Sequence, residues 1–269
     1  MINNTQKSFL ELVKDGLWGN GNPIIRIDET TDWQEVYQLA TEQSVLGLVL
    51  GGLEHSNVKP PQPLLLQWIG EVQMIEHRNR AINLFVAELV EKMRFADIYT
   101  TLIKGQGVAQ CYKKPLWRSA GDVDFCLNEE NFVKAREFLR PLAVNGYDPN
   151  DDNSRNISAK VGNWDIELHA NQFTGLSRRV DNGIKTVLND VLNKGHIRCW
   201  MNGNTQVLLP NADCDALLIF THFLKHFYKG GIGLRQICDW CRLLWTFKNT
   251  INHKYLESMI LKMGLMEEW

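Results

Sequence analysis

The sequence predicts an α+β protein in which a small mixed β-sheet lies between two helical segments. Apolar residues recur at helical spacing through the first hundred residues and again after Leu176. Between these segments, two short stretches alternate acidic with apolar residues, as half-buried strands do. We therefore expect an N-terminal helical region (1–95), an α/β core (96–205) and a C-terminal helical region (206–269).

Three helices are expected in the N-terminal region. The first runs from about Thr5 to Leu17, and the second is opened by Asp32, with Glu35 placed to complete a capping box. A long third helix follows Pro63, and its apolar residues recur every three or four positions. One face of this helix is therefore buried, and its opposite, charged face meets solvent.

The core begins where β-branched residues become frequent. Its expected elements, in order, are a strand at Ile98–Ile103, a helix at Val108–Tyr112, a strand at Gly121–Leu127, a helix at Asn131–Leu142, an exposed loop at Asn150–Asn156, and strands at Ile157–Val161 and Trp164–His169.

Beyond Leu176 the pattern is mostly helical. Asp213–Phe227 and Leu234–Phe247 have the strongest helical spacing, and a glycine-rich stretch separates them. A last helix is expected from Tyr255 to Trp269. Because it stops without a cap, it fits either a truncated chain or a terminal helix that frays.

Composition excludes several classes of protein. The 29 Lys and Arg against 31 Asp and Glu give a net charge of -2, so the chain lacks the positive field that non-specific nucleic-acid binding needs. The N-terminus does not read as a secretion signal, and the longest apolar stretch, Val45 to Leu53, is too short to span a bilayer. The six cysteines read as reduced thiols. We expect a cytoplasmic protein with neither membrane nor nucleic acid as a partner.

Two acids in the core point to a metal site. In a strand, Asp122 and Asp124 project from one face while Val123 faces the core. Two close carboxylates repel each other unless a cation lies between them, and Mg²⁺ prefers oxygen ligands. A second D-x-D, at Asp213 and Asp215, is explained by the dipole of the helix that begins there.

The surroundings of Asp122 favour the metal interpretation. Upstream, Lys104-Gly105-Gln106-Gly107 joins a strand to a helix, where backbone N–H groups can approach an anion. Downstream, the last strand places Asp165, Glu167 and His169 on one face. Each piece also has a structural explanation, as a plain turn or solvated strand residues. Together they describe a triphosphate grip, a metal and a base.

His222 and His226 lie four residues apart on an expected helix and could both meet a metal. However, Phe223 stands where a zinc peptidase would carry its glutamate. Core packing or a supporting role near the site is the better interpretation. Cys238 and Cys241 form a single C-x-x-C without a second ligand pair, which argues against a zinc site there.

A set of these residues resembles a known family. It comprises Lys104-Gly105, Tyr112, Pro115, Arg118, Gly121-Asp122-Val123-Asp124, Ile166-Glu167-Leu168-His169, and the helical positions His222, His226, Leu234 and Asp239. The set is similar to that of the bacterial uncharacterised nucleotidyltransferases of the DNA polymerase beta-like superfamily. The resemblance covers about Ile98 to Leu244 and is sharpest from Arg118 to Leu127.

The resemblance implies a nucleotidyltransferase core that moves a nucleoside monophosphate from a nucleoside triphosphate and releases pyrophosphate. It implies that Asp122, Asp124 and a third carboxylate, Glu167, bind Mg²⁺, as one ion or two. Asp165 shares a face with Glu167 and competes for the third position.

We expect Lys104, Gly105, Gln106 and Arg118 to orient the triphosphate. Two features depart from the family pattern: Gly105-Gln106 replaces the usual Gly-Ser pair, and the stretch from there to Asp122 is longer. The acceptor is a small molecule or a protein that the sequence does not define. One alternative is an inactive nucleotide-binding or regulatory module of the same fold, and another is a helical scaffold whose strands are only structural.

Overall fold

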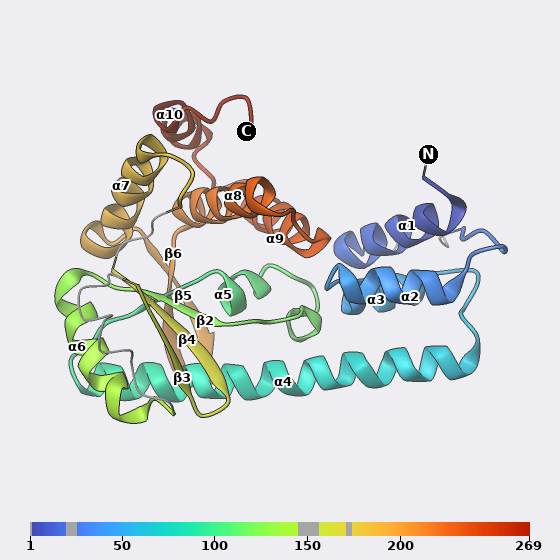
Figure 1. Cartoon of the computed structure of the whole chain (residues 1–269), viewed down its shortest axis with the longest axis horizontal. Coiled ribbons are helices and arrows are strands. Elements are labelled where there is room, and N and C mark those ends of the chain that lie inside the picture. Colours follow the sequence, from blue (N-terminus) through green and yellow to red (C-terminus); the bar gives the residue numbers. More distant parts are fainter. Residues whose placement is uncertain (1, 20–25, 145–155, 171–173) are drawn as a thin grey trace. The chain divides into compact units, whose positions relative to one another are not determined.

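The computed structural model describes residues 2–19, 26–144, 156–170 and 174–269 (Figure 1). These residues form two compact, discontinuous units. Unit 1 consists of Met1–Ala81, Ala109–Ala120 and Gly233–Arg242, and unit 2 of Ile82–Val108, Gly121–Ile232 and Leu243–Trp269. The three-part division expected from the sequence remains a prediction.

Unit 1 is helical. Its elements are α1 (Asn4–Trp18), α2 (Trp33–Glu42), α3 (Leu46–Leu53), the first part of α4 (Gln62–Phe95), the short η1 (Pro115–Trp117) and the first part of α9 (Leu234–Thr246). The predicted N-cap of α2 is confirmed, because the Asp32 side chain accepts from the N–H groups of Gln34 and Glu35. The reciprocal half of the capping box is replaced: the Asp32 N–H donates to Thr5 Oγ1 instead (3.1 Å).

Helices α1 and α3 approach each other closely because glycines face the contact. A Cβ atom at Gly16 would overlap the carbonyl of Leu48, and one at Gly52 would overlap the carbonyl of Leu12. Around this crossing, the side chains of Leu12, Val13 and Val49 are buried. Backbone-to-backbone packing of this kind requires residues without a Cβ.

Unit 2 contains the sheet. Its further elements are the end of α4, β1 (Thr101–Ile103), α5 (Gly105–Ala109), β2 (Val123–Cys126), α6 (Glu129–Leu139), η2 (Arg140–Leu142), β3 (Asn156–Val161), β4 (Trp164–His169), α7 (Arg178–Lys194), β5 (Ile197–Asn202), β6 (Thr205–Pro210), α8 (Ala212–Lys229), the end of α9 and α10 (His253–Met263). In the described part of the chain, no helix is long and apolar enough to cross a bilayer.

The six-stranded sheet is mixed, with the order β3-β4-β2-β1-β6-β5. Strands β2 and β4 are parallel, as are β1 and β6, and the remaining neighbours are antiparallel. The expected α+β class with helices before and after a mixed sheet is therefore confirmed.

The two faces of the sheet have different chemistry. Val123, Phe125, Ile166 and Leu168 project into a core that the end of α4 and helix α6 complete. Because side chains alternate along a strand, Asp124, Glu167 and His169 must project from the opposite face. In unit 2, α8 and the end of α4 lie on opposite sides of the strands (Figure 1).

Several expected boundaries change in the structure. Asp122 precedes β2 instead of lying in it, and Gly105 already begins α5, three residues before the expected start. The final helix ends at Met263, because Gly264 adopts a left-handed conformation (φ 73°) as its C-cap. The expected loop 150–156 lies outside the described residues except for Asn156, which begins β3.

A hairpin replaces part of the helical segment expected after Leu176. Strands β5 and β6 pair around Gly203, whose φ of 62° suits a tight turn. The alternation of β5 involves exposed and half-exposed residues, so its apolar signal is weak. The dipeptide Gly203-Asn204 is the local signal that could have indicated this hairpin.

Candidate active site

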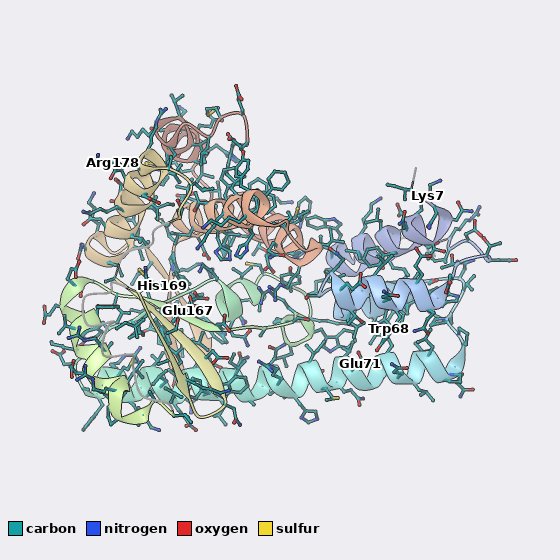
Figure 2. The ribbon with its side chains drawn as sticks, viewed as in Figure 1. Lys7, Trp68, Glu71, Glu167, His169 and Arg178 are labelled. Atoms are coloured by element: carbon teal, nitrogen blue, oxygen red, sulfur yellow. The ribbon has the colours of Figure 1, made fainter. Side chains whose placement is uncertain are left out.

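The pairing of β2 with β4 places two acids side by side. These strands are parallel, and Asp124 pairs with Glu167 in their register. His169 lies two residues further along β4, so it projects from the same face as Glu167. Figure 2 labels both residues in the region of the sheet. The ligand atoms of these three side chains all lie within 4.8 Å of one another. Such a group can hold a metal ion.

Asp124 is the centre of this group. Its Oδ1 accepts a hydrogen bond from Lys104 Nζ (3.1 Å) and lies 3.0 Å from His169 Nε2. Burial disfavours the ionised carboxylate, but the hydrogen bonds from His169 and Lys104 outweigh it and hold the pKa of Asp124 well below its usual range. Asp124 is therefore an ionised carboxylate at neutral pH, as a metal ligand must be.

His169 is fixed from both sides. Its Nδ1 lies 2.9 Å from Asn156 Oδ1 on β3, and its Nε2 lies 3.4 Å from Glu167 Oε2. Burial opposes protonation, but the hydrogen bonds to Asp124 and Glu167 raise the pKa of His169. The ring can serve as a nitrogen ligand when neutral, or position the Asp124 carboxylate when protonated.

Asp122 and Asp165 lie at the edge of this group. Asp122 is exposed on the whole, but its carboxylate is partly desolvated by its neighbours. This desolvation and the charges of Glu167 and Asp124 raise its pKa. Its carboxylate thus senses the same acidic environment, although the close ligand group holds Asp124, Glu167 and His169. In the parallel pairing of β2 with β4, Glu167 pairs with Asp124. Asp165 lies two residues earlier on β4, and its partner in the register is Lys160 of β3. The structure therefore places Glu167, and not Asp165, beside Asp124.

A family model described as uncharacterised nucleotidyltransferase matches residues 29–268. The chain belongs to this family of uncharacterised nucleotidyltransferases. The match covers the acids and most of both units. No curated protein and no solved structure matches the chain. Family membership supports nucleotidyl transfer as the kind of reaction, and the group of Asp124, Glu167 and His169 provides a candidate metal site for it.

Lys104 and Gly105 form the sharp turn between β1 and α5. Both have positive φ angles, 57° at Lys104 and 38° at Gly105. A non-glycine residue with positive φ is uncommon, so the turn is held by its surroundings, including the contact of Lys104 with Asp124. The turn places the Lys104 ammonium within reach of the acids.

The Gln106 side chain is directed toward α4, whereas that of Lys104 contacts Asp124. Its side chain is buried, and its Nε2 donates to Asn83 Oδ1 of α4. The amide is therefore directed toward that helix in the structure. Its predicted contact with the nucleotide remains a prediction.

Arg118 belongs to unit 1, whereas the acids belong to unit 2. It is buried, and its Nε and Nη2 donate to the two carboxylate oxygens of Asp239 (2.6 and 2.7 Å). Tyr112 donates to the same carboxylate (2.7 Å). Arg118 is thus part of a buried ion pair, and its predicted role in nucleotide binding remains untested.

Two histidines of unit 2, His169 and His222, interact electrostatically with Asp124. His169 is not among the predicted site residues, although the strand alternation that places it on the face of Glu167 is the sequence signal for its position. His222 of α8 is close enough for Lys104 and Asp124 to affect its ionisation. Burial and the positive charge of Lys104 lower the pKa of His222 to about 3. The i, i+4 pattern of His222 and His226 was the only local signal for this placement.

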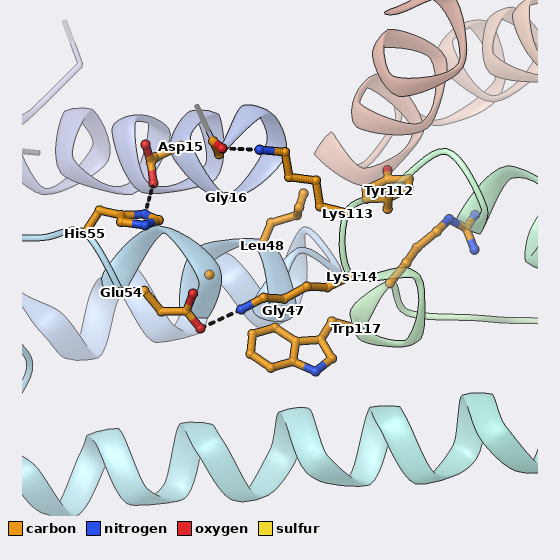
Figure 3. A pocket seen from close by; sticks show the side chains of 13 residues that line it. Asp15, Gly16, Gly47, Leu48, Glu54, His55, Tyr112, Lys113, Lys114 and Trp117 are labelled. Carbon is orange, nitrogen blue, oxygen red and sulfur yellow. Dashed lines mark hydrogen bonds and ion pairs between the residues drawn. The ribbon is translucent and has the colours of Figure 1, made fainter. Parts of the chain in front are cut away.

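Unit 1 contains a separate pocket between α1, α3 and residues 112–118 (Figure 3). Two ion pairs border it, Asp15 with His55 (2.8 Å) and Glu54 with Lys114. Gly16 of α1 and Gly47 and Gly51 of α3 are among the residues that line it. Because the acids of this pocket are already paired with bases, we assign it no part in the chemistry.

Proposed function

We propose that this protein transfers a nucleoside monophosphate from a nucleoside triphosphate to a small-molecule or protein acceptor, with Mg²⁺ bound at Asp124 and Glu167. The register that pairs Asp124 with Glu167 carries the proposal, because it brings two carboxylates to one place on the sheet of a nucleotidyltransferase-family chain. Asp122, which senses both charges, is the third candidate ligand.

The donor set fits a hard divalent ion. Mg²⁺ is usually held by one or two carboxylates together with substrate phosphates, and Asp124 and Glu167 supply such oxygens. The imidazole of His169 is a less suitable Mg²⁺ ligand, so we assign it to holding the Asp124 carboxylate in place. When bound, one ion or two would neutralise phosphate charge and polarise the phosphoryl group.

The remaining residues act on the substrates. Lys104 can exchange its contact with Asp124 for one with the triphosphate, because its ammonium is a flexible point charge. Glu167, with 38% of its side chain exposed, can accept the proton of the acceptor hydroxyl. Gly105, Gln106 and Arg118 remain candidates for nucleotide binding.

One observation favours a second function, an inactive nucleotide-binding or regulatory module. Gln106 stands where the related enzymes carry serine, and its side chain contacts Asn83. Such a module would bind the nucleotide without turning it over. The experiment that tests the proposed function also separates this alternative.

We expect purified protein with Mg²⁺ and labelled nucleoside triphosphates to release pyrophosphate in the presence of acceptor. Asp124→Asn should abolish Mg²⁺-dependent nucleotide binding by calorimetry, because it removes a ligand charge. Glu167→Gln leaves the charges of Asp124 and Asp122 for the ion, so it should keep most binding. It should lose turnover by roughly 10²–10⁴-fold, because an amide cannot accept the acceptor's proton.

Asp165→Asn is the matched control, since Asp165 shares the strand face of Glu167 but is not beside Asp124. It should behave like the parent protein. Binding without pyrophosphate release across all acceptors would favour the inactive module. Equal nucleotide affinity in Mg²⁺ and in chelator would contradict the metal site.

A further inference from the structure

A triphosphate at the acids needs more positive charge than the sheet provides. Lys104 is the basic side chain that contacts Asp124 from the β1–α5 turn, and it already forms an ion pair there. Arg118, the other predicted cation, is paired with Asp239 in unit 1. Mg²⁺ offsets only part of the charge of a triphosphate. A further source of positive charge is therefore expected near the acids.

One face of α8 carries four nitrogen-bearing side chains, which we call the α8 stripe. Its members are His222, Lys225, His226 and Lys229. Their spacing, i, i+3, i+4 and i+7, places them on one side of a helix. The rings of His222 and His226 contact each other, with centroids 4.5 Å apart. The buried residues Thr221 and Leu224 mark the neighbouring face, which packs into unit 2.

α8 lies on the side of the strands opposite the end of α4 (Figure 1), which is the side to which Asp124, Glu167 and His169 project. Lys104 and Asp124 both affect the ionisation of His222, so this end of the stripe senses the charges of the site. At the other end of the stripe, a Cβ built on Gly175 would lie 3.2 Å from Lys229 Nζ.

The lysines of the stripe are not neutralised by acids in the described structure. Among the described residues, no carboxylate lies within ion-pair distance of Lys225 or Lys229, whereas Lys104 and Lys194 of the same unit each have an acidic partner. Lys225 is half-buried and Lys229 is exposed. A phosphate group could therefore contact either ammonium without displacing a carboxylate of the described residues.

We propose that the α8 stripe binds the terminal phosphates of the nucleoside triphosphate that the acids hold. This inference rests on the proposed function and names the residues that would grip the leaving group. In the transfer, the acceptor oxygen bonds to the α-phosphorus, and the acceptor proton passes to Glu167. The bond from that phosphorus to the bridging oxygen breaks, and pyrophosphate leaves with the electron pair. The ammonium groups of Lys225 and Lys229 then stabilise the negative charge that develops on the leaving pyrophosphate.

The test uses the full chain and inorganic tripolyphosphate, which has the terminal phosphates but no nucleoside. Calorimetry in chelator measures binding without the metal. The parent protein should bind tripolyphosphate, and Lys225→Gln and Lys229→Gln should each bind it on the order of tenfold more weakly, the effect of losing one charge-assisted hydrogen bond. Binding should also weaken as salt is added.

Lys185→Gln on α7 is the matched control, because Lys185 is also an exposed helical lysine of unit 2. It should bind tripolyphosphate like the parent. Asp124→Asn should bind as well as the parent or better, since it removes a repelling charge. Equal tripolyphosphate affinity in the parent and the Lys225→Gln/Lys229→Gln double variant would contradict phosphate binding by the α8 stripe.

The same variants separate this inference from the proposed function. Suppose that the double variant loses tripolyphosphate binding and that the parent turns over no nucleotide. This result would support phosphate binding by the α8 stripe and contradict nucleotidyl transfer. Suppose instead that turnover depends on Asp124 and that the double variant keeps the parent's Michaelis constant for the nucleoside triphosphate. This result would support nucleotidyl transfer and contradict phosphate binding by the α8 stripe.

Discussion

At the scale of single residues, the site is organised around one buried carboxylate. Asp124 contacts Lys104 from one side and His169 from the other. Its side chain is only 12% exposed, so an ionised group there needs such partners. The two basic groups thus stabilise the charge that a metal site requires. His169 is in turn positioned by Asn156, which links β3 to the same arrangement.

Arg118 illustrates how a basic residue can belong to a buried pair. Both carboxylate oxygens of Asp239 accept from its guanidinium, and Tyr112 adds a third hydrogen bond. This contact joins two segments of unit 1 that lie 121 residues apart in the chain. A residue in this position supports folding, whatever else it contacts.

We therefore predict that Arg118→Met lowers the free energy of unfolding by about 3–5 kcal/mol, because it leaves the Asp239 carboxylate buried without its cation. Urea unfolding followed by circular dichroism measures this. Arg178→Met is the control: Arg178 is exposed at the start of α7 (Figure 2), and its loss should change stability by less than ~0.5 kcal/mol. Unchanged stability with a raised Michaelis constant for nucleotide would instead place Arg118 at the substrate.

At the scale of elements, glycines decide how the first helices pack. Gly16 of α1 faces the backbone of α3, and a Cβ there would overlap the carbonyl of Leu48. Gly70 of α4 has no heavy atom within 4 Å of such a Cβ. Position 16 therefore requires glycine because of a tertiary contact. Position 70 has room for a side chain, so only helix propensity decides which residue is favoured there.

Gly16→Ala is expected to destabilise the protein by about 1–3 kcal/mol, because the two helix backbones must separate to admit the methyl group. Gly70→Ala should stabilise it by up to about 1 kcal/mol, because alanine is the better helix former. Denaturant midpoints of both variants measure the difference. A stabilising Gly16→Ala would show that α1 and α3 do not approach as closely as described.

At the scale of the whole molecule, the sheet of unit 2 holds the acids and the unit's helices surround them. A ligand that binds the folded acids, but not the unfolded chain, must stabilise the fold. Metal and nucleotide should act together, because a triphosphate beside Asp124 and Glu167 without an ion places like charges close to one another.

We predict that a nucleoside triphosphate with Mg²⁺, at about 100 times its dissociation constant, raises the free energy of unfolding by about 2.7 kcal/mol. Thermal melting with Mg²⁺ alone, nucleotide in chelator, and both together measures this. The combined shift should exceed the sum of the separate shifts. In Asp124→Asn that excess should disappear, and its persistence would show that the nucleotide binds elsewhere.

The sequence by itself determined the elements whose signals are local. The alternation of acid and apolar residues predicted β4 with its observed bounds, because the period of a strand is written in consecutive residues. The N-cap of α2 was readable for the same reason: Asp32 and the N–H groups that it accepts from lie within three residues. The face that carries Glu167 and His169 followed from that strand.

Only the tertiary structure decided which of these residues meet. The parallel pairing of β2 and β4 places Glu167 beside Asp124, and a shift of one residue would have brought another side chain there. The partner of Arg118 and the position of the α8 stripe likewise depend on contacts between segments far apart in the chain. Such contacts arise from packing and strand pairing, which no short window of sequence specifies.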